Sequence, residues 1–143
     1  MSGEAQAALA ALPHGPEFRF LDRLVLLEPG VSGCSTYTLR GDEPFLRGHF
    51  PGMPLLPGVL LLEAAAQLAG VVAQSDACQT PLRDLKLTAI RSAKFLGSPR
   101  PGETVTVDAR IVARLGLLVQ ARVTATLAGQ TILECEVTLA GTR

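Results

Sequence analysis

The stretch Val59–Gln74, which reads VLLLEAAAQLAGVVAQ, decides the fold class of this 143-residue chain. Its Leu and Ala residues are good helix formers, and Pro57-Gly58 stands where a helix would begin. Apart from Glu63, Gln67 and the final Gln74 the stretch is apolar on every face, which is typical of a buried helix. It falls short of the ~20 residues that a membrane span needs. The sequence therefore predicts one long helix inside the core.

Extended segments surround this helix on both sides in the sequence. Apolar and polar residues alternate along the C-terminal half, and this period of two is typical of antiparallel strands with one buried face. The strand candidates are 18–28, 31–40, 82–95, 104–114, 119–127 and 132–139, and residues 5–12 predict a short helix. Five or six strands and one buried helix have few packing solutions. We expect an α+β fold in a single domain, 1–143, with a curled antiparallel sheet wrapped round one long buried helix.

The overall composition excludes several function classes. Thirteen basic residues balance thirteen acidic ones, so a charge-driven nucleic-acid binder is not expected. Cys34, Cys78 and Cys135 lie far apart without a Cys-x-x-Cys pair, which argues against a disulfide framework or a zinc site. The expected compartment is the reducing cytoplasm, with no membrane partner.

The segment from Gly41 to Gly58 has a composition unlike the rest. It contains four prolines, and so many missing N–H donors predict a stiff irregular loop. Long irregular loops in a compact domain are often functional. This loop carries His49 and leads directly into the buried helix.

Three features of the loop and helix predict chemistry together. His49 offers a base, and Gly58 offers a backbone N–H at a helix start, where a carbonyl oxygen gaining negative charge is stabilised. Glu63 is a carboxylate in an apolar helix, and Gln67, one turn later, lies on the same face and can hydrogen-bond to it. Such parts can remove a proton α to a carbonyl and expel a group from the β carbon. A Glu63 that merely reaches the surface remains the alternative. The sequence indicates no partner for His14, which is expected to be structural.

The run from His49-Phe50-Pro51-Gly52 through Glu63 to Gln67 resembles the signature of the 3-hydroxyacyl-[acyl-carrier-protein] dehydratases of fatty-acid synthesis, the FabZ type, which have the hotdog fold. Weaker similarity extends along nearly the whole chain, at Pro13-His14, Asp22-Arg23, Leu27-Glu28-Pro29-Gly30, Glu43-Pro44-Phe45, Ala93-Lys94-Phe95 and Pro101-Gly102. The hotdog fold is a sheet curled round a helix, as expected above from the patterning.

The resemblance implies a role for each part of the motif. His49 would take the C2 proton, Glu63 would help the C3 hydroxyl leave as water, and Gly58 would bind the thioester oxygen. The further residues implied in substrate binding are Val59, Gln67, Phe50 and Pro57. A related dehydratase/isomerase class carries Asp at the acid position, so Glu63 favours simple dehydration. No metal or cofactor is implied.

The resemblance also implies partners. In this family the histidine and the acid of one site come from different subunits, so a homodimer, or a larger assembly such as a trimer of dimers, is expected. The acyl substrate would be linked as a thioester to the phosphopantetheine arm of an acyl carrier protein. Arg91, Lys94 and Arg100 are the expected docking residues for that acidic carrier, with ordinary solvated strand ends as the alternative.

The chain departs from the family pattern in two places. Gly15-Pro16-Glu17-Phe18 and then Arg19 follow His14 in place of an Arg-Tyr-Pro-Phe-like run, and Leu96-Gly97 replace basic residues. These changes do not touch the residues of the proposed chemistry. They leave open the length of the acyl chain, the pathway, and whether the substrate is linked to a carrier protein or to coenzyme A. Two other functions also remain open: a hotdog thioesterase, and a non-catalytic subunit that only binds acyl chains.

Overall fold

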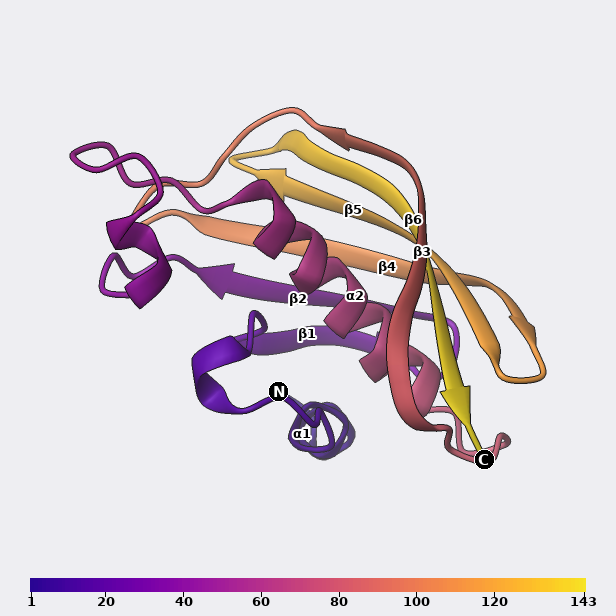
Figure 1. Cartoon of the computed structure of the whole chain (residues 1–143). Helices are drawn as coiled ribbons and strands as arrows, with labels where there is room; N and C mark the ends of the chain where they lie inside the picture. The colour runs from indigo at the N-terminus through magenta and orange to yellow at the C-terminus, as the bar shows by residue number, and fades with distance from the viewer.

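The computed structural model describes residues 1–143 as one curled, six-stranded antiparallel sheet with a long helix across it (Figure 1). The strands are β1 (Arg23–Glu28), β2 (Ser32–Thr38), β3 (Arg83–Phe95), β4 (Thr104–Leu115), β5 (Leu118–Leu127) and β6 (Gln130–Thr142). Their order in the sheet is β1-β2-β4-β5-β6-β3. The helix is α2 (Gly58–Gln74), and a short α1 (Gly3–Ala10) packs against β1 and α2. The predicted α+β architecture is confirmed.

The helix α2 is buried for the reason that its sequence indicates. Its apolar side chains lie against the inner faces of β2, β4, β5 and β6, whose alternate residues also point inward. One contiguous cluster of 33 buried apolar residues results. Only the beginning of α2 departs from the prediction of all-round burial, because Val59 is 70 % exposed. None of the helices is long and apolar enough to cross a lipid bilayer.

Several boundaries differ from those that the sequence predicts; β6, for example, runs over Gln130–Thr142 and not over 132–139. Residues 18–28 are not extended throughout: Pro16–Phe18 form a 3-10 turn, and β1 begins only at Arg23. The short helix α1 begins and ends two residues earlier than expected, because Ser2 caps it by accepting a hydrogen bond from the Ala5 N–H. The proline-rich loop is irregular as predicted, apart from a 3-10 turn at Pro44–Arg47.

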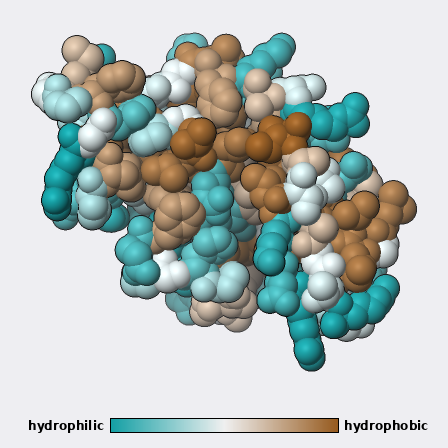
Figure 2. All heavy atoms as spheres, in the orientation of Figure 1, coloured by the Kyte–Doolittle hydropathy of each residue, from teal (hydrophilic) through white to brown (hydrophobic).

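Strand β3 forms an exposed edge of the sheet. It pairs only with β6, and eleven of its thirteen residues are exposed. Large apolar side chains are among them or directly after them: Leu87, Ile90, Phe95 and Leu96. Figure 2 shows apolar side chains gathered in a band over the beginning of α2 and towards β3. A long exposed edge of this kind is open to pairing with another chain.

Candidate active site

The loop that carries His49 is anchored at its base by a buried carboxylate. Glu43, only 5 % exposed, accepts hydrogen bonds from the Tyr37 hydroxyl at 2.6 Å and from the backbone N–H groups of Arg40 and Gly41 at 3.1 and 2.7 Å. Burial alone would raise the pKa of Glu43, but these hydrogen bonds outweigh burial and hold it below its usual value. Burial and the bond to Glu43 raise the pKa of Tyr37. The anchor therefore holds an ionised Glu43 beneath the loop.

His49 is held in one tautomer by the loop itself. Its Nδ1 lies 2.9 Å from the Leu55 carbonyl oxygen, which can only accept a hydrogen bond. Nδ1 therefore carries the hydrogen, and Nε2 is left with a free lone pair. The next residue, Phe50, has φ 60°, an unusual left-handed backbone for a side chain of its size. The site thus presents an oriented imidazole base on a strained turn.

The predicted helix start is confirmed: α2 begins at Gly58, with Pro57 as its N-cap residue. The first N–H groups of a helix have no partner within it, and the dipole makes this end partly positive. A Cβ at position 58 would lie 3.0 Å from the Phe95 ring, so glycine permits the close approach of β3 to this helix end. The N–H groups of Gly58 and Val59 can therefore receive a carbonyl oxygen at a fixed place.

Glu63 lies one and a half turns into α2 and has two partners. Gln67 Nε2 donates to Glu63 Oε2 at 3.1 Å, which confirms the predicted contact across one helical turn. His14 Nε2 lies 3.3 Å from the same oxygen. The Glu63 side chain is 24 % exposed, so the carboxylate reaches solvent at one end of a hydrogen-bonded cluster.

His14 has a partner that the sequence does not indicate, the carboxylate of Glu63. Its contact with Glu63 joins residues 14 and 63, which no local pattern in the sequence connects. Arg19 makes the contact possible, because its guanidinium donates to the carbonyl oxygens of Leu12 and His14 at 3.1 Å each and holds this turn. The hydrogen bond between Tyr37 and Glu43 was not predicted either. Glu43 stands next to Pro44 in the irregular loop, and nothing in the sequence there indicates that its carboxylate is buried.

Within one chain, His49 and Glu63 do not contact each other. The His49 ring bonds to Leu55 and packs on Phe50, whereas Glu63 bonds to Gln67 and contacts His14. Of the other side chains that the motif associates with substrate, Phe50 and Val59 are exposed near the beginning of α2, Pro57 is half-buried and Gln67 is buried. A single chain therefore displays a base and an acid in two separate places.

The expected docking residues lie on or near the exposed edge. Arg91 and Lys94 are in β3, opposite Glu136 and Glu134 of β6, so a glutamate faces each of them across the ladder. Arg100 lies in the following loop, where its N–H donates to the Glu103 carboxylate at 2.7 Å. All three are exposed.

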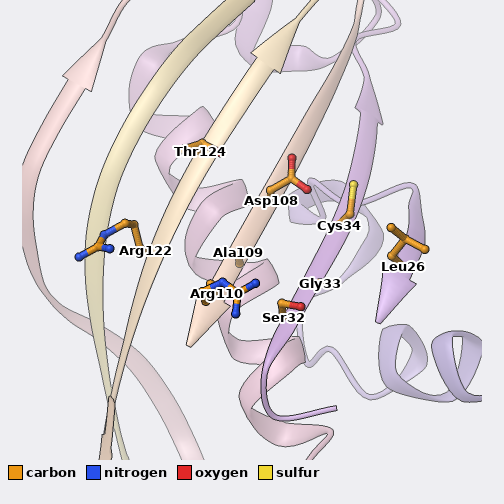
Figure 3. Close-up of a pocket in the computed structure, with 9 residues that line it drawn as sticks. All are labelled: Leu26, Ser32, Gly33, Cys34, Asp108, Ala109, Arg110, Arg122 and Thr124. Atoms are coloured by element: carbon orange, nitrogen blue, oxygen red, sulfur yellow. The ribbon is translucent and has the colours of Figure 1, made fainter. Parts of the chain in front are cut away.

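A separate hollow of about 440 Å³ lies on the outer face of the sheet, away from α2 (Figure 3). Cys34 of β2, Asp108 and Arg110 of β4 and Arg122 of β5 are among the residues that line it. Burial, with Asp108 beside it, raises the pKa of the Cys34 thiol to about 11, so this thiol is not a nucleophile at neutral pH. The hollow contains Asp108 but no histidine, whereas the loop and α2 together offer an imidazole, a carboxylate and free helix N–H groups.

Known proteins resemble this chain over nearly its whole length. A family model of the FabA-like domain matches residues 12–136. A 3-hydroxyacyl-[acyl-carrier-protein] dehydratase FabZ from Anaeromyxobacter sp. is 37 % identical over 136 residues, covering 93 % of this chain and 86 % of that protein.

Solved structures share the fold at lower identity. A dehydratase heterocomplex, ApeI:P, from Xenorhabdus doucetiae has a TM-score of 0.78 at 15 % identity, covering 92 % of this chain and 88 % of that one. A hypothetical thioesterase with coenzyme A from Streptococcus pneumoniae has a TM-score of 0.65 at 15 % identity, covering 85 % and 87 %. These likenesses identify the sheet curled round α2 as the hotdog fold.

Proposed function

The chain belongs to the FabA-like family, and from that membership we propose that it catalyses the reversible dehydration of a (3R)-3-hydroxyacyl thioester to the trans-2-enoyl thioester, in fatty-acid or related acyl-chain biosynthesis. The observation that carries the proposal is the tautomer of His49. Its Nδ1–H is committed to Leu55, so Nε2 is free to take a proton from carbon. The relatives that share the fold and the sequence are dehydratases by name.

A residue of the proposed site assists each bond that forms or breaks in the dehydration. His49 Nε2 takes the C2 proton while the thioester oxygen, gaining charge, binds the N–H groups of Gly58 and Val59. The C2 electron pair forms the C2–C3 double bond, and the C3–O bond breaks. Glu63 gives a proton to the departing hydroxyl, which leaves as water. The proton held on His49 then balances the one that Glu63 has lost.

We propose that each complete site uses His49 of one chain and Glu63 of a second copy. The two side chains do not meet within a chain, and the exposed apolar edge of β3 suits antiparallel pairing with another β3. The homodimer, alone or in a larger assembly, is then the smallest active unit, with 1–143 as a single domain. The three free cysteines suit a reducing cytoplasm.

The test of the function is an assay that separates two products. A 3-hydroxyacyl thioester should yield the absorbance of the conjugated enoyl thioester without release of free thiol. His49→Ala and Glu63→Gln should each lower kcat about 10²–10⁴-fold, the usual value of a general acid or base. Thiol release without enoyl product would indicate a thioesterase, and wild-type turnover in either variant would refute the mechanism.

We further propose that the carrier is an acyl carrier protein that docks on Arg91, Lys94 and Arg100. The side chains of a strand point to the faces of its sheet, so those of Arg91 and Lys94 stay accessible when the backbone edge of β3 pairs with a second copy. Charges at the rim of an interface act mainly on association. Reversing Arg91 and Lys94 to Glu should therefore raise KM for a carrier-linked substrate, most at low salt, with little change in kcat. The same acyl group on a short pantetheine should react as before; equal impairment of both substrates would refute docking at this edge.

A further inference from the structure

The two oxygens of the Glu63 carboxyl group have different surroundings. Oε2 faces two N–H donors, Gln67 Nε2 at 3.1 Å and His14 Nε2 at 3.3 Å. Oε1 accepts no hydrogen bond within the chain and is not among the buried polar atoms without a partner, and the side chain as a whole is 24 % exposed. A carboxylic acid whose one oxygen accepts two N–H groups carries its own hydrogen on the other oxygen.

The orientation of Gln67 is fixed by its own partners. Its Oε1 accepts from the Phe20 N–H at 2.9 Å, and its Nε2 donates to the Phe18 carbonyl oxygen at 2.9 Å as well as to Glu63. A flipped amide would set oxygen against oxygen and N–H against N–H, so the amide N–H points at Glu63. Because Gln67 is only 2 % exposed, water cannot replace these partners.

The tautomer of His14 follows from its surroundings as well. Its Nδ1 is buried with no hydrogen-bond partner, and a buried N–H left without an acceptor is costly. The hydrogen of the neutral ring therefore sits on Nε2, which faces the carboxyl oxygen. The His14 ring stacks on the Phe18 ring with centroids 6.3 Å apart, and the Arg19 guanidinium donates a hydrogen bond to the His14 carbonyl oxygen.

We propose that His14 is a positioning residue for the acid of this site: together with Gln67 it makes Oε2 of Glu63 the accepting oxygen and leaves Oε1 as the one that delivers the proton. This inference rests on the proposed dehydration. As the C3–O bond breaks, the Oε1 proton moves to the departing oxygen and Glu63 becomes a carboxylate. Hydrogen bonds to a carboxylate are stronger than those to a neutral acid, so both donors favour the proton transfer.

The kinetic test compares two substitutions of similar size. His14→Leu removes the donor and should lower kcat about 10- to 100-fold, the value of a hydrogen bond to a charged group, with KM nearly unchanged. His14→Gln places an amide N–H near the position of Nε2 and should recover most of the loss. A similar melting temperature for both variants separates this effect from simple unfolding. A raised KM with unchanged kcat would overturn the inference.

A double-mutant cycle shows whether His14 acts through Glu63. In a Glu63→Gln background, His14→Leu should cost less than about threefold, because the proton that it positions is already gone. An equal cost in both backgrounds would mean that His14 acts on something else, and the inference would be wrong.

A second measurement needs no turnover and so decides the inference even if the proposed reaction fails. The chain has only two histidines, so ¹⁵N-labelled histidine gives a simple spectrum that His14→Gln assigns. His14 should show a protonated Nε2 and a bare Nδ1, and Glu63→Leu should disturb that pattern. A protonated Nδ1, or no response to Glu63→Leu, would overturn the role of His14, whereas a wild-type enzyme without dehydratase activity would refute the function alone.

Discussion

Glu43 is the one charged side chain that the fold buries, and it lies at the base of the loop that carries His49. A buried carboxylate is tolerated when donors surround it, and here a hydroxyl and two backbone N–H groups do so. The bonds tie the end of β2 to the turn before Pro44. The position of the loop that carries His49 thus depends on a residue with no part in the proposed reaction.

The stability that Glu43 contributes should depend on pH. Its pKa is lowered in the folded state from an ordinary value of 4.5. Its contribution is therefore fully present above the unfolded pKa and is lost as pH falls through the lowered, folded one. Glu43→Gln should reduce the free energy of unfolding by about 1–3 kcal/mol at neutral pH, and the difference should shrink in acid. Urea unfolding near pH 7 and near pH 3.5 measures both; a constant difference would contradict an ionised anchor.

The residues of the proposed site could be named from the sequence because they lie close together in it. His49, Gly58 and Glu63 share one loop and one helix, and Gln67 follows at helical spacing. The contacts of His14 with Glu63 and of Tyr37 with Glu43 could not be predicted. The first joins distant segments, and the second depends on how β2 leads into an irregular loop.

At the scale of elements, the C-terminal end of α2 is held by a strand. Arg114 of β4 donates to the Ala73 carbonyl oxygen at 2.8 Å and to the Thr80 carbonyl oxygen at 3.2 Å. The last carbonyl groups of a helix lack partners and carry partial negative charge, so a cation there stabilises the helix. The same side chain also fixes the loop that leaves α2.

Arg114→Ala should therefore lower the free energy of unfolding by about 1–3 kcal/mol. Arg110 lies on the same strand, is exposed and has no hydrogen bond or ion pair, so Arg110→Ala is the matched control and should change stability by less than about 0.5 kcal/mol. Chemical denaturation of the two variants compares them directly. Equal losses would mean that Arg114 contributes only the packing of its stem.

The alternation of apolar and polar residues predicted the strands but not their order. Strands β4, β5 and β6 are neighbours both in the sequence and in the sheet, as short turns require. Strand β3 comes before β4 in the sequence yet lies at the far edge, beside β6. Its weak alternation gave little sign of this place, because most of its residues are exposed on both faces.

At the scale of the whole molecule, one chain is an incomplete enzyme under the proposed mechanism. Its base and its acid do not bond to each other, and β3, a long edge strand with apolar side chains, pairs with β6 on one side and with no strand on the other. Pairing two β3 edges would bury those side chains and bring a second α2 beside the first. Both features have one explanation if the sites form between subunits.

This explanation predicts that two inactive variants restore each other. His49→Ala and Glu63→Gln proteins, mixed after dissociation and reassociation, should regain activity that neither has alone. Random pairing makes about half of the dimers mixed, and each mixed dimer contains one intact site and one doubly altered site. Recovery should therefore approach roughly a quarter of wild-type activity if the two sites are independent.

Subunit exchange must be measured together with the recovered activity. Dimers whose subunits never separate would stay inactive because no mixed dimer forms, whatever the arrangement of the sites. Differently tagged variants and a pull-down give the mixed fraction, and activity should rise in proportion to it. A double variant, His49→Ala with Glu63→Gln in the same chain, mixed with wild type is the matched control: each mixed dimer then has two half-altered sites. That mixture should fall below the average of its parents as exchange proceeds, while the first mixture rises. Full exchange without recovery in the first mixture would place both residues of a site in one chain.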